Sequence, residues 1–391
     1  MTTTRGDVAR IAGVSTATVS YVVNGGPRPV AEETRTRVLR AIEQLGYKPN
    51  LLARRMARKK TRAVALVVPD IANPFFAELG HHVEDAAFAA GYTLILCNCS
   101  HGVERERAHL ALLDEKRIDG ILLITSGLGR DDVRGIVERH TPVVLLDRDV
   151  AGATVDAVLA DNVAIGRYAV EHLLGHGYTT IACLAGPPGL AEAAQRVEGY
   201  QQALQQCDPT PETRLIRWHD LTFEGGYRAL HSLFVAGLRP RAVFASNDQM
   251  AVGALHAAHE LGLTVPADLA IVGVDDTLPS AIAVPPLTTV AQPIAAMGRR
   301  GLALLLDRVK GTASPAPQHV VLAPELVVRG SCGCALTSPT IHWSNFAFNG
   351  STVSHAVAGS QPVEPMAPRL LASRGEQLQD DRRWSLQRGA G

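Results

Sequence analysis

The sequence has little of what marks a secreted, disulfide-bonded or membrane-spanning protein. Its 391 residues include only 6 cysteines, too few for a disulfide scaffold and typical of a chain in a reducing compartment. No Arg-flanked apolar run opens the chain, so we expect no secretion signal. The longest early apolar run, residues 63–68, is far too short to cross a membrane. We therefore expect a cytoplasmic protein without a membrane partner.

Motifs of the common catalytic classes are also missing. The sequence has no Gly-x-Ser-x-Gly elbow, no His-Glu-x-x-His and no Walker phosphate-binding loop. The pairs Cys97 with Cys99 and Cys332 with Cys334 could in principle share a metal ion. However, Cys97 falls in a predicted buried strand, and the 14 histidines show no metal-ligand spacing. We expect no catalytic residues, no metal and no cofactor, and hence no enzyme.

Net charge is absent overall but not locally. Residues 1–62 hold 13 Lys and Arg against 4 Asp and Glu, a net charge of +9, so the remainder carries −9. A basic end on an acidic body is typical of a protein that meets phosphate through one end only.

The basic end contains two short amphipathic segments on either side of Gly13. Apolar residues recur there at helical spacing, at Val8, Ile11, Ala12, Val19, Val22 and Val23. Two short helices joined by a Gly turn, with Ser15 as an N-cap, predict a helix-turn-helix whose second helix enters the DNA major groove. A third helix over residues 31–45 closes the core through Val38, Leu39, Ile42 and Leu45. The alternative is a surface helix pair with no partner.

Residues 50–58 predict a short hinge helix, with Arg54, Arg55 and Arg58 as cations. A helix of this length is marginal in water, so we expect it to form when DNA holds it. Met56 is then the apolar side chain available to wedge into the minor groove. A charged linker is the structural alternative.

From residue 62 the pattern alternates between strands and helices. In the first unit we expect strands at 63–68, 93–97, 120–124 and 143–146, and helices at 75–90, 104–116 and 131–139. After residue 161 we expect strands at 179–184, 214–217, 242–244 and 269–273, and helices at 162–175, 195–206, 225–236 and 247–261. The fold class is therefore α/β, with two doubly wound parallel units that face each other across a cleft.

Ligands of such sheets bind at the carboxyl ends of the strands, so the residues just past those ends are candidate ligands of an effector. They are Asn73, Phe75, Phe76, Asp147, Arg148, Arg196, Asn247, Asp275 and Gln292. Aromatic faces pack on the C–H face of a sugar ring, carboxylates accept from hydroxyls, and Arg donates as a planar fork. Singly, an Asp could cap a helix and a Phe could be core. Their recurrence at several strand ends favours a site for a small sugar.

Four groups of residues in the basic end carry a recognisable motif: Asp7-Val8-Ala9, Gly13-Val14-Ser15-Thr16, Thr18-Val19-Ser20 and Val23-Asn24. They resemble the head of the lactose-repressor family of bacterial transcription regulators. Ala53-Arg54 before Met56 resembles its hinge helix. Further matches in the body of the chain, such as Phe244-Ala-Ser-Asn-Asp-Gln-Met250 and Pro286-Leu-Thr-Thr289, extend the resemblance over residues 5–330.

The resemblance implies a homodimeric, nucleoid-associated repressor that binds a roughly palindromic operator in double-stranded DNA. It implies a head (1–48), a hinge (49–61) and a periplasmic-binding-protein-like core (62–330). The first lobe takes 62–161 and 292–320, and the second takes 162–291 and 321–330. DNA contacts are assigned to Thr16, Ala17, Thr18, Tyr21, Asn24, Arg54, Arg55, Met56 and Arg58. Residues 337–391 have no counterpart in the family, and their composition predicts a disordered tail.

Within the family, the cleft is most similar to the ribose-binding branch, in which the nine strand-end residues match sugar-contacting positions. Purine repressors carry a basic residue in the loop where residues 190–194 offer none, so a purine corepressor is not expected. Tyr21 stands where relatives carry His or Arg, so the operator sequence does not carry over. Three rival readings remain: a sugar receptor without a DNA role, a sugar-acting enzyme, and a regulator controlled by a protein corepressor.

Overall fold

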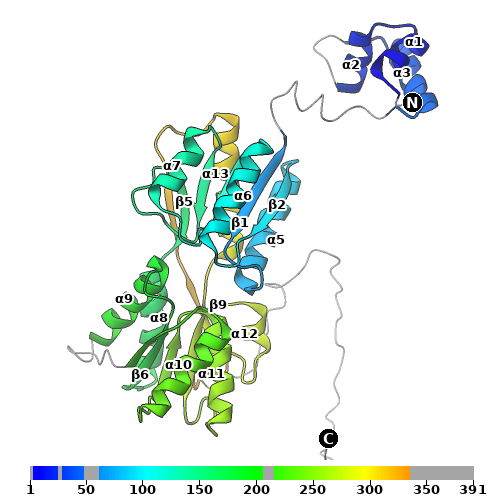
Figure 1. Ribbon diagram of the computed structural model, residues 1–391. Helices are drawn as coiled ribbons and strands as arrows, with labels where there is room; N and C mark the ends of the chain where they lie inside the picture. Colours follow the sequence, from blue (N-terminus) through cyan, green and yellow to red (C-terminus); the bar gives the residue numbers. More distant parts are fainter. Residues whose placement is uncertain (1–2, 25–28, 48–60, 206–214, 335–391) are drawn as a thin grey trace, which may run out of the picture. The chain divides into compact units, whose positions relative to one another are not determined.

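The computed structural model describes residues 3–24, 29–47, 61–205 and 215–334, which form a helical head and a core of two sheets (Figure 1). The predicted hinge, with Arg54, Arg55, Met56 and Arg58, lies outside the described residues, as does the tail at 337–391. The α/β fold class predicted from the sequence is confirmed.

The head consists of α1 (Arg5–Ala12), α2 (Thr16–Asn24) and α3 (Glu32–Leu45). Gly13 ends α1 with a φ of 64°, in the left-handed region that favours glycine. The hydroxyl of Ser15 then accepts the backbone N–H of Thr18 at 3.1 Å and caps α2. The helix-turn-helix geometry follows from these two residues.

The head core contains seven buried side chains: Val8, Ala9, Ala12, Val19, Val22, Val38 and Ala41. The sequence prediction was wrong at Ile11 and Leu39, which are 47% and 48% exposed. Ala9 and Ala41 are buried instead, because their small side chains fit where the helices of this small core approach closely.

The first sheet is parallel throughout, in the order β11-β5-β4-β3-β1-β2. Its strands are β1 (Ala63–Val68), β2 (Thr93–Asn98), β3 (Gly120–Leu123), β4 (Val143–Leu146), β5 (Asp156–Ala160) and β11 (His319–Leu322). Packed apolar side chains put α5 (Pro74–Ala89) and α13 (Ile294–Lys310) on one face. On the other face lie α6 (Val103–Glu115) and α7 (Arg130–Glu138).

The second sheet has the order β12-β10-β9-β8-β6-β7, and only its edge strand β12 is antiparallel. Its strands are β6 (Ile181–Ala185), β7 (Ile216–Trp218), β8 (Ala242–Ala245), β9 (Ala270–Asp275), β10 (Thr288–Ala291) and β12 (Glu325–Val327). One face packs on α8 (Asn162–Gly175) and α9 (Ala191–Gln205). The other packs on α10 (Phe223–Val235) and α11 (Asp248–Glu260), and the short α12 (Leu278–Ile282) follows β9.

The chain passes between the two sheets three times: from β5 to α8, from β10 to α13, and from β11 to β12. The sequence did not predict β5, β11 or β12; β11 and β12 are edge strands paired with segments distant in sequence, and β5 lies between β4 and β11. It also started α9 at residue 195, four residues later than the observed Ala191.

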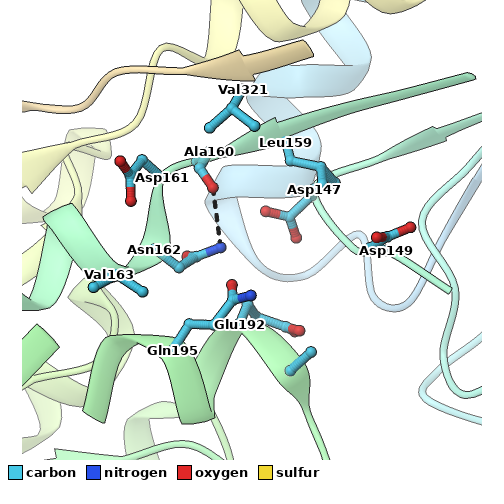
Figure 2. A pocket seen from close by; sticks show the side chains of 11 residues that line it. Asp147, Asp149, Leu159, Ala160, Asp161, Asn162, Val163, Glu192, Gln195 and Val321 are labelled. Atoms are coloured by element: carbon cyan, nitrogen blue, oxygen red, sulfur yellow. Dashed lines mark hydrogen bonds between the residues drawn. The ribbon is translucent and has the colours of Figure 1, made fainter. Parts of the chain in front are cut away.

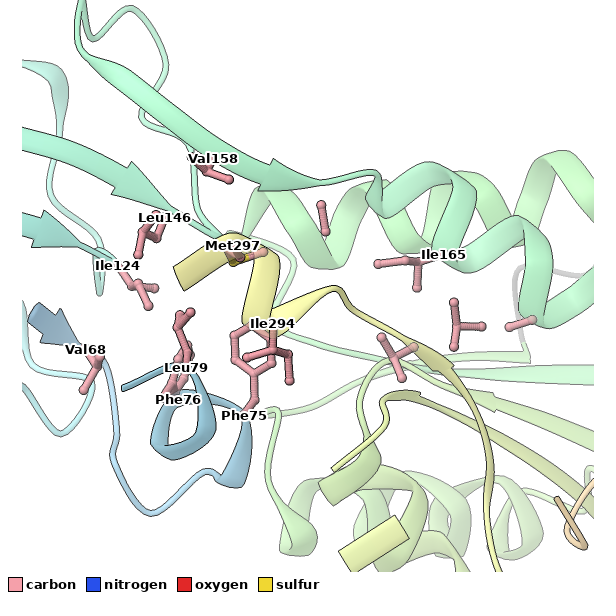
Figure 3. Close-up of a cluster of buried hydrophobic side chains, with 14 of the residues drawn as sticks. Val68, Phe75, Phe76, Leu79, Ile124, Leu146, Val158, Ile165, Ile294 and Met297 are labelled. Atoms are coloured by element: carbon pink, nitrogen blue, oxygen red, sulfur yellow. The ribbon is translucent and has the colours of Figure 1, made fainter. Parts of the chain in front are cut away.

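One apolar cluster is shared by both sheets (Figure 3). Phe75 and Phe76 from α5 pack beside Ile294 and Met297 of α13, and the cluster continues to Ile165 of α8. Among the described residues, no helix is long and apolar enough to cross a membrane.

The close packing of α8 on α9 depends on Gly166 and Gly199. A Cβ atom at Gly166 would lie 2.0 Å from the carbonyl oxygen of Arg196, and one at Gly199 would lie 2.0 Å from that of Val163. Both positions exclude any side chain. This contact therefore fixes where α9 presents Arg196 to the first turn of α8.

We predict that Gly166→Ala lowers the free energy of unfolding by about 1–3 kcal/mol, since α8 and α9 must move apart. Gly175→Ala in the same helix is the matched control, because no atom lies within 4 Å of a Cβ there. It should leave stability unchanged or raise it by up to about 1 kcal/mol. Urea unfolding followed by circular dichroism measures both, and equal midpoints would contradict the packing argument.

Candidate functional site

The head presents the first turn of α2 as a candidate DNA-reading surface. Thr16 and Ala17 are exposed, Thr18 and Tyr21 are half-buried, and Asn24 ends the helix. The Thr18 hydroxyl lies 2.9 Å from the Ser15 hydroxyl, so it takes part in the helix cap. Exposed residues at the N-terminal end of a second helix are the ones that reach base edges in a helix-turn-helix.

In the core, Asp147 and Arg148 follow β4 at the carboxyl end of the first sheet. Both are buried, and Asp147 has a φ of 61°. Asp275, at the end of β9 in the second sheet, has a φ of 114°. Residues other than glycine rarely have a positive φ, and backbone strain of this kind is concentrated at ligand-binding sites.

Arg148 joins the two lobes through an ion pair with Glu192. Its Nε lies 2.7 Å from Glu192 Oε1 at the start of α9, and both side chains are almost fully buried. A second guanidinium nitrogen donates to the carbonyl oxygen of Thr125 at 2.9 Å. The same guanidinium lies 5.9 Å from the centre of the Phe76 ring. Arg148 is therefore held by contacts from both lobes.

In the second lobe, Arg196 makes two buried hydrogen bonds. Its Nε donates to Asn162 Oδ1 at 2.9 Å, and its Nη1 donates to the carbonyl oxygen of Ser246 at 2.6 Å. These partners stand at the start of α8 and just after β8. One buried Arg thus ties together two strand-to-helix junctions.

Asp275 and Gln292 form a second buried polar pair. The amide nitrogen of Gln292 donates to Asp275 Oδ1 at 2.7 Å, across the ends of β9 and β10. Both residues were predicted from their strand-end positions, and the structure brings them into contact.

Electrostatics couple these groups. The pKa of Asp147 is raised to about 6, chiefly by burial and in addition by the nearby Glu192 carboxylate, while Arg148 and Arg196 oppose the shift. Burial also raises the pKa of Asp275 well above its usual range; Arg196 lowers it, and Asp147 is among the groups that raise it. Asp147 raises the pKa of Asp275, and Arg196 lowers the pKa of both acids, so the three groups belong to one charged cluster.

Four predicted effector residues have structural roles in this arrangement. The side chains of Asn73 and Asn247 cap α5 and α11 by accepting the N–H groups of Phe75 and Met250. Phe75 and Phe76 lie edge-to-face within the apolar cluster, with ring centres 5.2 Å apart (Figure 3). None of these four lines the pocket described next.

A pocket of about 170 Å³ lies where the two lobes meet (Figure 2). Asp147 and Asp149 of the first lobe face Glu192 and Gln195 of α9 across it. Of the nine effector residues predicted from the sequence, only Asp147 lines this pocket.

Sequence reasoning missed five polar residues here: Asp149, Asp161, Asn162, Glu192 and Gln195. Asp161 caps α8, and Asn162 bonds Arg196. Asp161 and Asn162 follow the end of β5, so predicting that strand would have identified them, but the sequence did not predict it. Glu192 was not considered because the predicted helix began at residue 195, whereas α9 begins at Ala191.

The expectation that no histidines have a metal-ligand spacing is wrong. His172 and His176 are four residues apart at the end of α8, so they share one side of the helix. Cys332 and Cys334 lie beside them. Cys97, in contrast, is buried in β2 as predicted.

Two family models match the chain. The model for bacterial regulatory proteins of the lacI family covers residues 5–50, and a periplasmic binding protein-like domain covers residues 170–332. The transcriptional regulator DegA of Bacillus subtilis is 36% identical over 336 residues, which are 85% of this chain and 98% of that protein. The transcriptional repressor PurR of Proteus mirabilis is 38% identical over 328 residues, 83% and 95% of the two chains.

Solved structures agree. The lac repressor dimer bound to operator and an anti-inducer has a TM-score of 0.76 and 29% identity over 85% of this chain and 99% of that one. The complex of the transcriptional regulator CelR with cellobiose has a TM-score of 0.64 and 35% identity over 84% and 99%. The chain therefore belongs to the lacI family of bacterial regulatory proteins, whose members are DNA-binding transcriptional regulators and not enzymes.

Proposed function

We propose that this protein is a homodimeric repressor whose affinity for a palindromic operator is set by one small sugar, a pentose such as ribose, bound between the lobes of each core. The observation that supports a sugar is a set of buried oxygen atoms. Within the described residues, Asp147 Oδ1, Gln292 Oε1 and Ser246 Oγ have no hydrogen-bond partner.

Each such atom destabilises the folded protein by about 1–3 kcal/mol unless a ligand or a water molecule forms a hydrogen bond with it. A carboxylate oxygen and an amide oxygen only accept hydrogen bonds, so the missing partner must donate. A ring with several hydroxyl groups supplies many donors in a small volume. The pattern therefore favours a polyol over an apolar effector.

The pocket, which Asp147 lines but Gln292 and Ser246 do not, also favours a small ligand by its size. A volume of about 170 Å³ is below the roughly 300–1,000 Å³ of sites for drug-sized ligands. It favours a single sugar ring over a disaccharide, although the similar CelR structure holds cellobiose. Glu192, ion-paired to Arg148, lies at the start of α9, within the segment (residues 190–194) where a purine site would need a cation.

For the head, we propose that Thr16, Ala17, Thr18, Tyr21 and Asn24 face the bases of the operator. One such helix reads only a few base pairs, so two copies at fixed spacing are needed for specificity. The similar lac repressor is a dimer on its operator, which supports the same assembly here. The protein would then act in the cytoplasm, on the nucleoid.

The effector acts through the spacing of the two heads. A ligand that touches both lobes favours one arrangement of them, and the paired cores pass that arrangement on through residues 49–61. Because coupling is reciprocal, operator DNA must change sugar affinity by the same factor as sugar changes operator affinity.

The first prediction concerns the ligand. Titration calorimetry of the full chain with D-ribose, other pentoses, cellobiose and hypoxanthine should show saturable heat, one site per chain, with a pentose. Repeating the titration with the protein's own upstream DNA should shift the sugar Kd by a reproducible factor. Absence of heat with every sugar at millimolar concentration would overturn the sugar assignment but leave the DNA-binding role intact.

The second prediction concerns DNA. Thr16→Ala should weaken operator binding by roughly 5- to 100-fold, because a polar contact to a base edge is worth about 1–3 kcal/mol. Non-specific DNA should bind as before. Thr36→Ala, on the exposed side of α3, is the control. Fluorescence anisotropy measures both variants; an equal loss on both DNAs would remove Thr16 from base reading.

The third prediction uses the titration of Asp147. Its raised pKa of about 6 means that a proton competes with the hydroxyls of the sugar below that pH. Sugar affinity should therefore fall about tenfold between about pH 7.5 and pH 5. The sign is opposite for the sugar-free fold, which gains stability as pH falls through this pKa because the buried charge is neutralised.

Asp147→Asn should bind sugar weakly at both pH values and lose the pH dependence. Asp149→Asn is the matched control: it lines the same pocket, but its side chain is exposed, so the pH dependence should survive. A pH dependence that persists in Asp147→Asn would assign the titration to Asp275 instead, whose pKa burial also raises.

A further inference from the structure

A second group of polar side chains lies at the other end of α8 from the pocket. The first turn of α8 borders the pocket, and its last turn carries His172, followed by His176. At the rise of an α-helix, its 14 residues span about 20 Å. Cys332 and Cys334, from the segment after β12, meet the two histidines there.

The four ligand atoms gather in a small volume. One nitrogen of each histidine and the sulfur of each cysteine all lie within 4.8 Å of one another. His176 Nε2 is 3.0 Å from Cys334 Sγ, and His172 Nε2 is 3.8 Å from the same sulfur. In a tetrahedral zinc site with ordinary bond lengths, neighbouring ligand atoms are about 3.3–3.8 Å apart.

Both segments that supply these ligands are anchored. The histidines stand one helical turn apart at the end of α8, which packs on α9. The cysteine segment is held by Ser331, whose carbonyl oxygen accepts from Ile271 N and whose hydroxyl accepts from Thr288 N and donates to Ile271 O. The ligand positions therefore exist before any ion arrives.

Each residue alone has an ordinary explanation. Histidines are favoured near a helix C-terminus by the helix dipole, and a buried cysteine such as Cys332 behaves as a small apolar residue. These explanations do not account for two thiols and two imidazoles from segments more than 150 residues apart converging on one point. Thiolate and imidazole together are the ligands that select zinc.

We propose that His172, His176, Cys332 and Cys334 bind one Zn²⁺ ion in a structural Cys₂His₂ site. Four protein ligands close the coordination sphere, so the ion is not available for catalysis. The ion would link the segment that contains Cys332 and Cys334 to the C-terminal end of α8. Its binding does not depend on the proposed sugar or on DNA.

The test uses the full chain without a polyhistidine tag, kept reduced with a non-chelating phosphine. Chelator-treated protein is titrated with Co²⁺, whose thiolate charge-transfer and visible bands report tetrahedral sulfur coordination. We expect one Co²⁺ per chain, displaced by Zn²⁺. We also expect a higher unfolding temperature with Zn²⁺ than with chelator, because the ion binds the folded state.

Cys334→Ser and His176→Gln remove ligands at partly exposed and exposed positions, so the fold should survive. Each should weaken binding by at least about 100-fold and remove or shift the cobalt bands. The controls are Cys97→Ala, in the other Cys-x-Cys pair, and His256→Gln, an exposed histidine on α11. Both should bind cobalt as the unmodified chain does.

No cobalt bands in the reduced chain would overturn the proposal, including the case in which Cys332 and Cys334 are isolated as a disulfide and bind no metal after reduction. Equal loss of binding in Cys97→Ala and Cys334→Ser would also overturn it, because the ion would then belong to other cysteines.

Discussion

The ion pair between Arg148 and Glu192 is a buried charged contact between the two lobes of the core. It joins the end of β4 to the start of α9, and both side chains are buried. Losing either partner would leave a buried charge, which typically costs about 3–5 kcal/mol. The pair therefore connects the two lobes beside the pocket that Asp147 and Glu192 line.

That charge is unbalanced. Three carboxylates (Asp147, Glu192 and Asp275) face two guanidinium groups (Arg148 and Arg196). Burial raises the pKa of Asp147, the neighbouring Glu192 carboxylate adds to the shift, and Asp147 Oδ1 has no hydrogen-bond partner among the described residues. A neutral donor such as a sugar hydroxyl satisfies that oxygen without adding charge, whereas an anionic effector would worsen the imbalance. The charges beside the Arg148–Glu192 pair therefore favour a neutral effector over an anionic one.

The sequence predicted the architecture because parallel strands are short apolar runs and their carboxyl ends share one edge. That rule found Asp147, Arg148, Arg196, Asp275 and Gln292, all of which are buried: Gln292 bonds Asp275, and Arg196 and Asp147 both influence the pKa of Asp275. It could not separate them from Asn73 and Asn247, which stand at the same kind of junction. A residue after a strand also precedes a helix, where Asn is a good cap. The hydrogen bonds show that Asn73 and Asn247 cap helices, and their contact with an effector stays a prediction.

What the sequence missed depends on contacts between distant segments. Strand β5 pairs with β4 and β11, and because this strand was not predicted, Asp161 and Asn162 were not recognised as residues that follow a strand end, although the helix at 162–175 was expected. The head core shows the same limit on a smaller scale, because helical spacing alone could not rank Ala9 above Ile11.

Helix α8 shows what such long-range contacts add. Its first turn holds Asn162 against Arg196, and its last turn carries His172 beside Cys334. A rigid helix packed on α9 through Gly166 keeps both ends in fixed register with the second sheet. An ion at the far end would stabilise the folded second lobe without touching the effector network, because it binds only the folded arrangement of two remote segments. Stability and sensing would then be placed at opposite ends of one helix, which lets either change without disturbing the other.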